Sequence, residues 1–115
     1  MHVMFDLAGT VFGLLDMSLR PGIRETLAEL RCAGIKVDFW TSGSVENYSA
    51  LLGNSGIEGE VYSKHCRLPF TPDVCVDDDP CGATQGRVVK VRPHIAIDYP
   101  CDRIDALMLI RGMAA

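Results

Sequence analysis

Short, mainly apolar runs that each end in a polar side chain limit most strongly how this chain can fold. The clearest are residues 2–5, 35–40 and 73–76. Runs of this kind, rich in branched and aromatic residues and without strict polar alternation, are typical of strands buried on both faces of a parallel sheet. Asp6, Thr41 and Asp77 follow the three runs directly. The sequence therefore predicts parallel strands that carry polar groups at their carboxyl ends.

Segments with helical spacing lie between these runs. The first has apolar residues at Ile23, Leu27 and Leu30. Gly34 follows where a helix commonly ends, and Ser44 is suited to cap a second helix that ends near Gly53. The apolar positions of that second helix are Tyr48, Leu51 and Leu52. Strands that alternate with helices predict a three-layer, Rossmann-like α/β fold with a mainly parallel sheet.

The remaining elements are marked less strongly. Further strands are expected at residues 57–62 and 88–91, and an edge strand at residues 95–97. Asp102 is suited to cap a last helix. The apolar side of that helix is expected at Ile104, Leu107 and Met108. A chain of 115 residues has room for one core, so residues 1–115 are treated as a single domain.

The charge balance excludes some classes of partner. With 11 Lys and Arg against 15 Asp and Glu, the formal net charge is -4. A protein that grips nucleic acid through a general basic surface needs the opposite excess. Apolar residues also never continue for the roughly 18 positions that a membrane span requires. We therefore expect no membrane partner, no general nucleic-acid-binding surface and a cytoplasmic location.

The cysteines indicate free thiols. Five cysteines cannot all pair within one chain, which excludes a complete intrachain disulfide framework. Zinc is disfavoured because no C-x-x-C motif occurs and Cys75 and Cys81 lie six positions apart. Cys32 and Cys75 have apolar neighbours and are expected to be buried. Trp40, inside an apolar run, is likewise expected in the core, whereas His65 and His94 have no evident partner.

Three motifs follow one another along the chain: Asp6-Leu7-Ala8-Gly9-Thr10, Phe39-Trp40-Thr41-Ser42-Gly43 and Val74-Cys75-Val76-Asp77-Asp78. In this order they resemble the haloacid dehalogenase (HAD) superfamily of phosphohydrolases. The basic residue that the family places upstream of the acidic pair is matched by Lys64, with Arg67 in reserve. The resemblance covers most of the chain and implies a HAD-like fold with the site at the carboxyl ends of the strands.

The resemblance also implies a role for each matching residue. Asp6 would attack phosphorus and form an aspartyl phosphate. Thr41 and Ser42 would bind phosphoryl oxygens, and Lys64 would hold the nucleophile and offset negative charge. The family's cofactor is Mg²⁺, a hard cation that prefers oxygen ligands.

The magnesium ligands implied for this chain are the Asp6 and Asp78 carboxylates and the backbone carbonyl of Ala8. Asp77 would support the metal from outside its direct ligands, by hydrogen bonds or through water. Both the cofactor and its ligand set are expectations that come from the resemblance.

Ala8 is the departure from the family pattern that matters most. Ordinary phosphatases of the family carry aspartate there, which protonates the leaving oxygen and later activates water. A positioned acid or base contributes about 100-fold to 10,000-fold, so alanine should weaken turnover. Three interpretations remain open: a weakened phosphatase acting on phosphate monoesters or acyl phosphates, an inactive binding or regulatory module, and chemistry like that of phosphonoacetaldehyde hydrolases, which also carry alanine at this place.

The spacing between motifs leaves no room for a cap domain. Only a short flap and one helix fit between Thr10 and Thr41, and the interval from Thr41 to Lys64 is shorter still. An uncovered site admits a large phosphorylated substrate, such as the end of a macromolecule, or a partner chain that excludes water. A second copy of this chain is one such partner.

Overall fold

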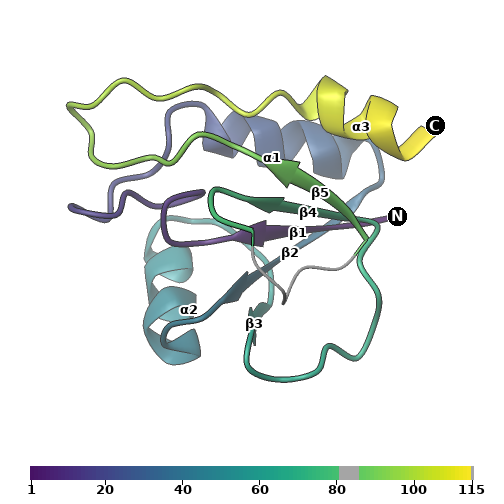
Figure 1. The fold of residues 1–115 in the computed structure, drawn as a ribbon, viewed down its shortest axis with the longest axis horizontal. Helices are drawn as coiled ribbons and strands as arrows, with labels where there is room; N and C mark the ends of the chain where they lie inside the picture. The colour runs from purple at the N-terminus through teal and green to yellow at the C-terminus, as the bar shows by residue number, and fades with distance from the viewer. Residues whose placement is uncertain (81–85, 115) are drawn as a thin grey trace.

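The computed structural model describes residues 1–80 and 86–114 as an α/β fold built on one parallel sheet (Figure 1). Its elements are β1 (His2–Asp6), α1 (Ile23–Cys32), β2 (Lys36–Thr41), α2 (Val45–Asn54), β3 (Val61–Ser63), β4 (Val74–Asp77), β5 (Arg87–Lys90) and α3 (Ala106–Ala114). The strand order is β3-β2-β1-β4-β5, and every pairing within the sheet is parallel. The predicted fold class is therefore confirmed at the level of a Rossmann-like parallel sheet flanked by helices.

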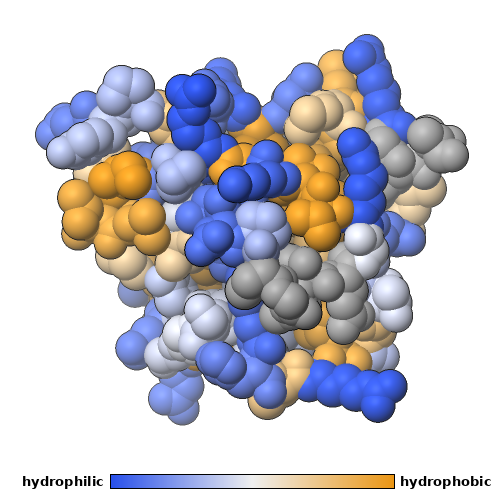
Figure 2. All heavy atoms as spheres, in the orientation of Figure 1, coloured by the Kyte–Doolittle hydropathy of each residue, from blue (hydrophilic) through white to orange (hydrophobic). Residues whose placement is uncertain are grey.

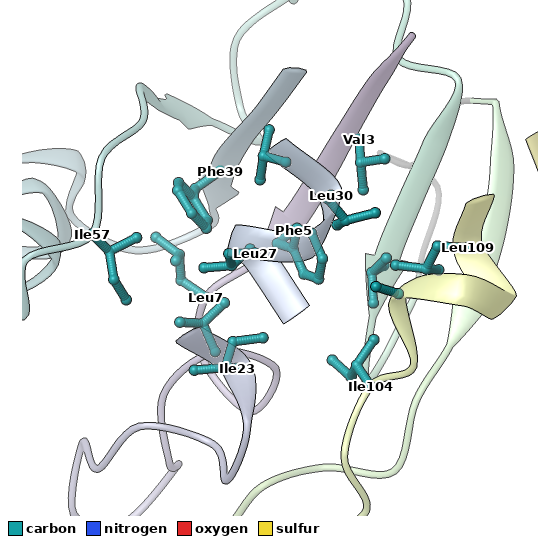
Figure 3. Close-up of a cluster of buried hydrophobic side chains, with 14 of the residues drawn as sticks. Val3, Phe5, Leu7, Ile23, Leu27, Leu30, Phe39, Ile57, Ile104 and Leu109 are labelled. Atoms are coloured by element: carbon teal, nitrogen blue, oxygen red, sulfur yellow. The ribbon is translucent and has the colours of Figure 1, made fainter. Parts of the chain in front are cut away.

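A large core cluster fills one face of the sheet. Val3 and Phe5 point to this face because alternate residues of a strand face opposite sides. All three helices add buried side chains to the cluster; examples are Leu27 and Leu30 of α1, Leu52 of α2 and Leu109 of α3. Figure 3 shows several of these side chains gathered around Phe5. Burial of each such side chain stabilises the fold by about 1.5–3 kcal/mol.

The opposite face carries a small core cluster without helical cover. Its buried members are Met4, Trp40, Leu68 and Cys75. Leu68 comes from the coil segment 64–73, and Phe70 of that segment packs against the cluster. Within residues 1–80 and 86–114 no helix contributes to this cluster. The three layers are thus unequal, with helices on one side of the sheet and coil on the other.

The predictions for single buried residues have mixed outcomes. Trp40 is 2% exposed and Cys75 is fully buried, so both expectations are confirmed. Cys32, expected to be buried, is exposed, because it lies at the end of α1 away from the face that carries Ile23 and Leu30. Cys81, whose separation from Cys75 disfavours a zinc site, lies outside the described residues.

The predicted capping residue is confirmed for α2 and is wrong for α3. The Ser44 hydroxyl accepts a hydrogen bond of 3.2 Å from the Asn47 N–H, as a helix cap does. The cap expected at Asp102 is wrong: α3 begins at Ala106, and the Asp105 carboxylate accepts from the Leu107 N–H at 2.9 Å.

The predicted apolar face of α3 is shifted as a result. Leu107 and Met108 are exposed, and Ala106 and Leu109 are the buried positions among residues 106–111. Ile104, also expected on this face, is buried but precedes the helix.

Two strand predictions also need correction. The expected edge strand at 95–97 is absent from the described residues, because this segment pairs with the loop between β1 and α1 instead of the sheet. The Leu15 N–H donates to the Ile95 carbonyl at 2.9 Å, and the Ile97 N–H donates to the Asp16 carboxylate at 2.9 Å. The strand expected at 57–62 begins four residues later and is β3 (Val61–Ser63).

A buried arginine ties the loop after β1 to the segment after β5. Arg20 is 1% exposed, and its guanidinium donates to the backbone carbonyls of Gly9, Thr10, Arg92 and Asp102. A buried guanidinium needs such acceptors because its desolvation is otherwise costly. The bond to Asp102 also explains why α3 starts late: the backbone of residue 102 is held against Arg20.

Candidate active site and metal centre

The polar residues predicted from the strand ends meet at one edge of the sheet. Asp6, Thr41 and Asp77 are the last residues of β1, β2 and β4. The chain moves outward from β1 to β2 and β3, then returns to β4 on the other side of β1. Ligands of open α/β sheets bind at such a switch point, outside the carboxyl ends of the strands. A cavity of about 440 Å³ opens here, and its lining includes Asp6 and Asp77.

Lys64 connects two of the carboxylates in this cavity. Its Nζ lies 2.9 Å from an oxygen of Asp6 and 2.7 Å from an oxygen of Asp77. The backbone N–H of Lys64 donates to the Thr41 carbonyl at 2.8 Å, and this bond holds Lys64 just beyond the end of β3. Burial alone would lower the pKa of Lys64, but its contacts with Asp77 and Asp6 outweigh burial and raise it. Arg67, the reserve for this role, is exposed.

Three carboxylates crowd together around this ammonium group. Oxygen atoms of Asp6, Asp77 and Asp78 all lie within 4.8 Å of one another. The pKa of Asp6 is raised to about 8, first by burial and then by the neighbouring carboxylates of Asp78 and Asp77, which together outweigh the opposing charge of Lys64. One ammonium therefore leaves surplus negative charge, and the donors are all hard oxygens. This set fits a divalent cation such as Mg²⁺.

The hydrogen bonds of Asp77 and Asp78 differ. One Asp77 oxygen faces Lys64 and the other accepts from the Asp79 N–H at 3.0 Å, so both are engaged. Asp78 is partly exposed and lines the cavity. This difference agrees with a direct metal contact for Asp78 and a supporting role for Asp77, which stays a prediction.

Thr10 and Gly9 pack against the three carboxylates, and the sequence analysis assigned no role to either residue. The Thr10 hydroxyl accepts from the Asp78 N–H at 3.0 Å, and carboxylate oxygens of Asp78 and Asp6 lie 3.1 and 3.3 Å from it. Gly9 has φ +82°, and a Cβ there would lie 2.4 Å from an oxygen of Asp78. Both residues belong to the first motif, so the motif itself could have indicated them as neighbours of the acidic group.

The two phosphate-binding candidates are placed differently, and of the two only Ser42 lines the cavity. Ser42 is exposed and lines the cavity. Thr41 is 2% exposed, and its hydroxyl oxygen accepts from the Gly43 N–H at 2.9 Å, which leaves the hydroxyl hydrogen to donate elsewhere. Ala8 also lines the cavity, and its methyl group can neither donate nor accept a proton.

The two histidines without an evident partner both have one. His65 lines the cavity, with Nε2 3.0 Å from the Ser42 carbonyl oxygen. His94 is fully buried, and its Nε2 lies 3.0 Å from the Ser18 hydroxyl. These partners are distant in sequence, so only the folded chain brings them together.

A short flap borders the cavity where other folds carry a cap. Leu14 lines the cavity and is 48% exposed. Leu15 and Met17, next to it, are exposed as well. Figure 2 shows apolar atoms gathered over this loop between β1 and α1. The loop leaves the site open to solvent, and the absence of a cap domain stays a prediction.

The comparisons with known proteins leave the family unassigned. No protein-family model, no curated protein sequence and no solved structure matched the chain significantly. None of the described helices combines the length and apolar character needed to cross a membrane. The resemblance to the HAD superfamily therefore depends on the motifs and on the position of their residues in the fold.

Proposed function

We propose that this chain is a magnesium-dependent phosphohydrolase of HAD type, acting on phosphate monoesters or acyl phosphates through an aspartyl phosphate on Asp6. The observation that carries the proposal is the group around Lys64. Its ammonium nitrogen lies 2.9 Å from Asp6 and 2.7 Å from Asp77, and Asp78 lies beside them at the switch point. A nucleophile, a cation and paired metal ligands are the groups that phosphoryl transfer through a carboxylate requires.

The chemistry divides into two displacements. An Asp6 oxygen bonds to phosphorus while the bond from phosphorus to the leaving oxygen breaks, and water then attacks phosphorus and frees the carboxylate. Lys64 offsets negative charge beside the nucleophile, and Thr41 and Ser42 bind phosphoryl oxygens. Mg²⁺, held by Asp6, Asp78 and the Ala8 carbonyl, would neutralise the phosphoryl group when bound.

Ala8 weakens this site relative to one with aspartate at the same position. Without a carboxyl group there, protonation of the leaving oxygen and activation of water depend on other groups. Acyl and aryl phosphates suffer least, because their leaving groups need little protonation. The open site also admits a large phosphorylated substrate, or a partner chain that covers it.

A non-catalytic binding module is the second candidate, and Ala8 is the observation that favours it. Such a module would bind Mg²⁺ and phosphate at the same residues without turnover. Chemistry like that of phosphonoacetaldehyde hydrolases has less support, because it uses a cap lysine. The sequence contains no lysine between Thr10 and Ile35, and the structure forms a flap and α1 there.

Acetyl phosphate separates the enzyme from the binding module. Mixed with the protein and Mg²⁺, it should add one phosphoryl group to Asp6, because its acyl leaving group needs no acid. Mass spectrometry of the acid-quenched protein detects the adduct, and Asp6→Asn serves as the blank. Mg²⁺ binding without an adduct on the native chain would reject the enzyme and favour the binding module.

A further inference from the structure

We propose that His65 carries out the proton transfer that Ala8 cannot. This inference rests on the proposed function and adds a catalytic residue to it. His65 and Ala8 line the same cavity as Asp6, and His65 is exposed at its border. A histidine is the side chain most often used to move a proton near neutral pH.

Hydrogen bonds on both sides fix the position of His65. The backbone N–H of His65 donates a hydrogen bond of 3.1 Å to the hydroxyl of Ser63, the last residue of β3. Its ring Nε2 lies 3.0 Å from the carbonyl oxygen of Ser42, in the motif proposed to bind phosphate. The ring thereby connects the ends of β2 and β3, the same two strands whose ends carry Thr41 and Lys64.

The Ser42 contact also determines which ring nitrogen can exchange a proton. A carbonyl oxygen only accepts hydrogen bonds, so Nε2 must carry the hydrogen. In the neutral ring Nδ1 then has the free lone pair of a base, and in the protonated ring Nδ1 carries the hydrogen of an acid. The Ser42 contact persists in both states, so the ring keeps its position while Nδ1 gains and loses a proton.

Other ionisable residues in the cavity are less suited to this task. Lys64 is held between Asp6 and Asp77, contacts that keep its proton in place. Both oxygens of Asp77 are engaged, by Lys64 and by the Asp79 N–H. Asp78 belongs to the candidate metal group. Asp79 is an exposed carboxylate in the lining and is the main rival of His65.

The proton balances over the two displacements. Protonated His65 gives its Nδ1 hydrogen to the leaving oxygen as the bond between that oxygen and phosphorus breaks and Asp6 takes the phosphoryl group. Neutral His65 then takes a proton from the water that attacks the aspartyl phosphate. Phosphate leaves, the Asp6 carboxylate is free and His65 is protonated again.

The test compares two substrates of similar shape that differ in their need for an acid. Phenyl phosphate has a poorer leaving group than 4-nitrophenyl phosphate. His65→Gln should lower kcat/KM for phenyl phosphate about 10-fold to 100-fold more than for 4-nitrophenyl phosphate. Adding Ala8→Asp to His65→Gln should restore the lost activity on phenyl phosphate, because it provides a carboxyl acid at the family's position.

Matched variants and the Asp6 adduct make each outcome decisive. Thr71→Val, at an exposed position of the same coil segment as His65 and outside the cavity lining, should leave the kcat/KM of both substrates unchanged. Equal losses on both substrates in His65→Gln, or none, would overturn the proposal, as would a selective loss in Asp79→Asn alone. Acetyl phosphate should still phosphorylate Asp6 in His65→Gln. If the native chain forms no adduct, the proposed function fails first and the role of His65 fails with it.

Discussion

The ammonium nitrogen of Lys64 lies 2.7 Å from the carboxylate of Asp77, and the two side chains are only 10% and 1% exposed. Removing one partner leaves the other charge buried, so Lys64→Met should lower the free energy of unfolding by about 3 kcal/mol or more in urea denaturation. Lys36 provides the control: it lies 4.0 Å from Asp38 but is 69% exposed. Lys36→Met should cost less than about 1 kcal/mol. Similar losses in the two variants would contradict the buried pair.

Magnesium should stabilise the protein through Asp78. A ligand that binds only the folded state stabilises it by about 2.7 kcal/mol at 100 times its dissociation constant. We expect Mg²⁺ to raise the Tm in differential scanning fluorimetry and Asp78→Ala to remove that rise. Asp98→Asn, exposed and outside the cavity lining, should keep it. An unchanged response in Asp78→Ala would exclude Asp78 from the metal site.

Gly9→Ala should disturb the candidate metal site more than its backbone conformation alone explains. Both Gly9 and Gly34 have positive φ, +82° and +78°, but a Cβ at Gly34 meets nothing within 4 Å. Gly34→Ala should therefore show only the backbone cost, about 1 kcal/mol. At Gly9 the added methyl group must displace Asp78, so stability should fall further and the Mg²⁺ response should weaken. Equal behaviour of the two variants in urea denaturation would refute this packing.

The flap should loosen in acid through Asp16. Hydrogen bonds from the Ser18 hydroxyl and the backbone N–H groups of Ile97 and Ser18 lower the pKa of Asp16 from 3.8 to about 2. A lowered folded-state pKa contributes stability above pH ~4 that is lost as the pH falls through ~2. In amide hydrogen exchange, Asp16→Asn should reduce protection of the Ile97 amide at pH 7. The difference from the native chain should disappear toward pH 2; a difference that does not change with pH would argue against this carboxylate.

The features that the sequence predicted depend on local patterns. Asp6 and Thr41 follow apolar runs, and the carboxyl ends of parallel strands necessarily meet at one edge. Ser44 caps α2 through a residue three positions away. Such signals need no knowledge of distant contacts, so the parallel sheet and the edge that carries the polar groups were predictable.

The errors occur where distant contacts decide the structure. The segment 95–97 has the composition of a strand, but Asp16 binds the Ile97 N–H and draws the segment to the flap. The start of α3 depends on Arg20, which holds the carbonyl of Asp102. The partners of His65 and His94, Ser42 and Ser18, also lie far away in the sequence, so no local pattern indicated them.

The four carbonyl acceptors of Arg20 connect the chain beyond β5 to the distant loop that follows Asp6. Two acceptors, Gly9 and Thr10, belong to the loop after Asp6, and two, Arg92 and Asp102, belong to the chain beyond β5. If either side detaches, the guanidinium loses acceptors in a buried place and the other side loses its support. We therefore expect the two regions to open and close as one cooperative unit, so that the chain beyond β5 supports the backbone around the first motif.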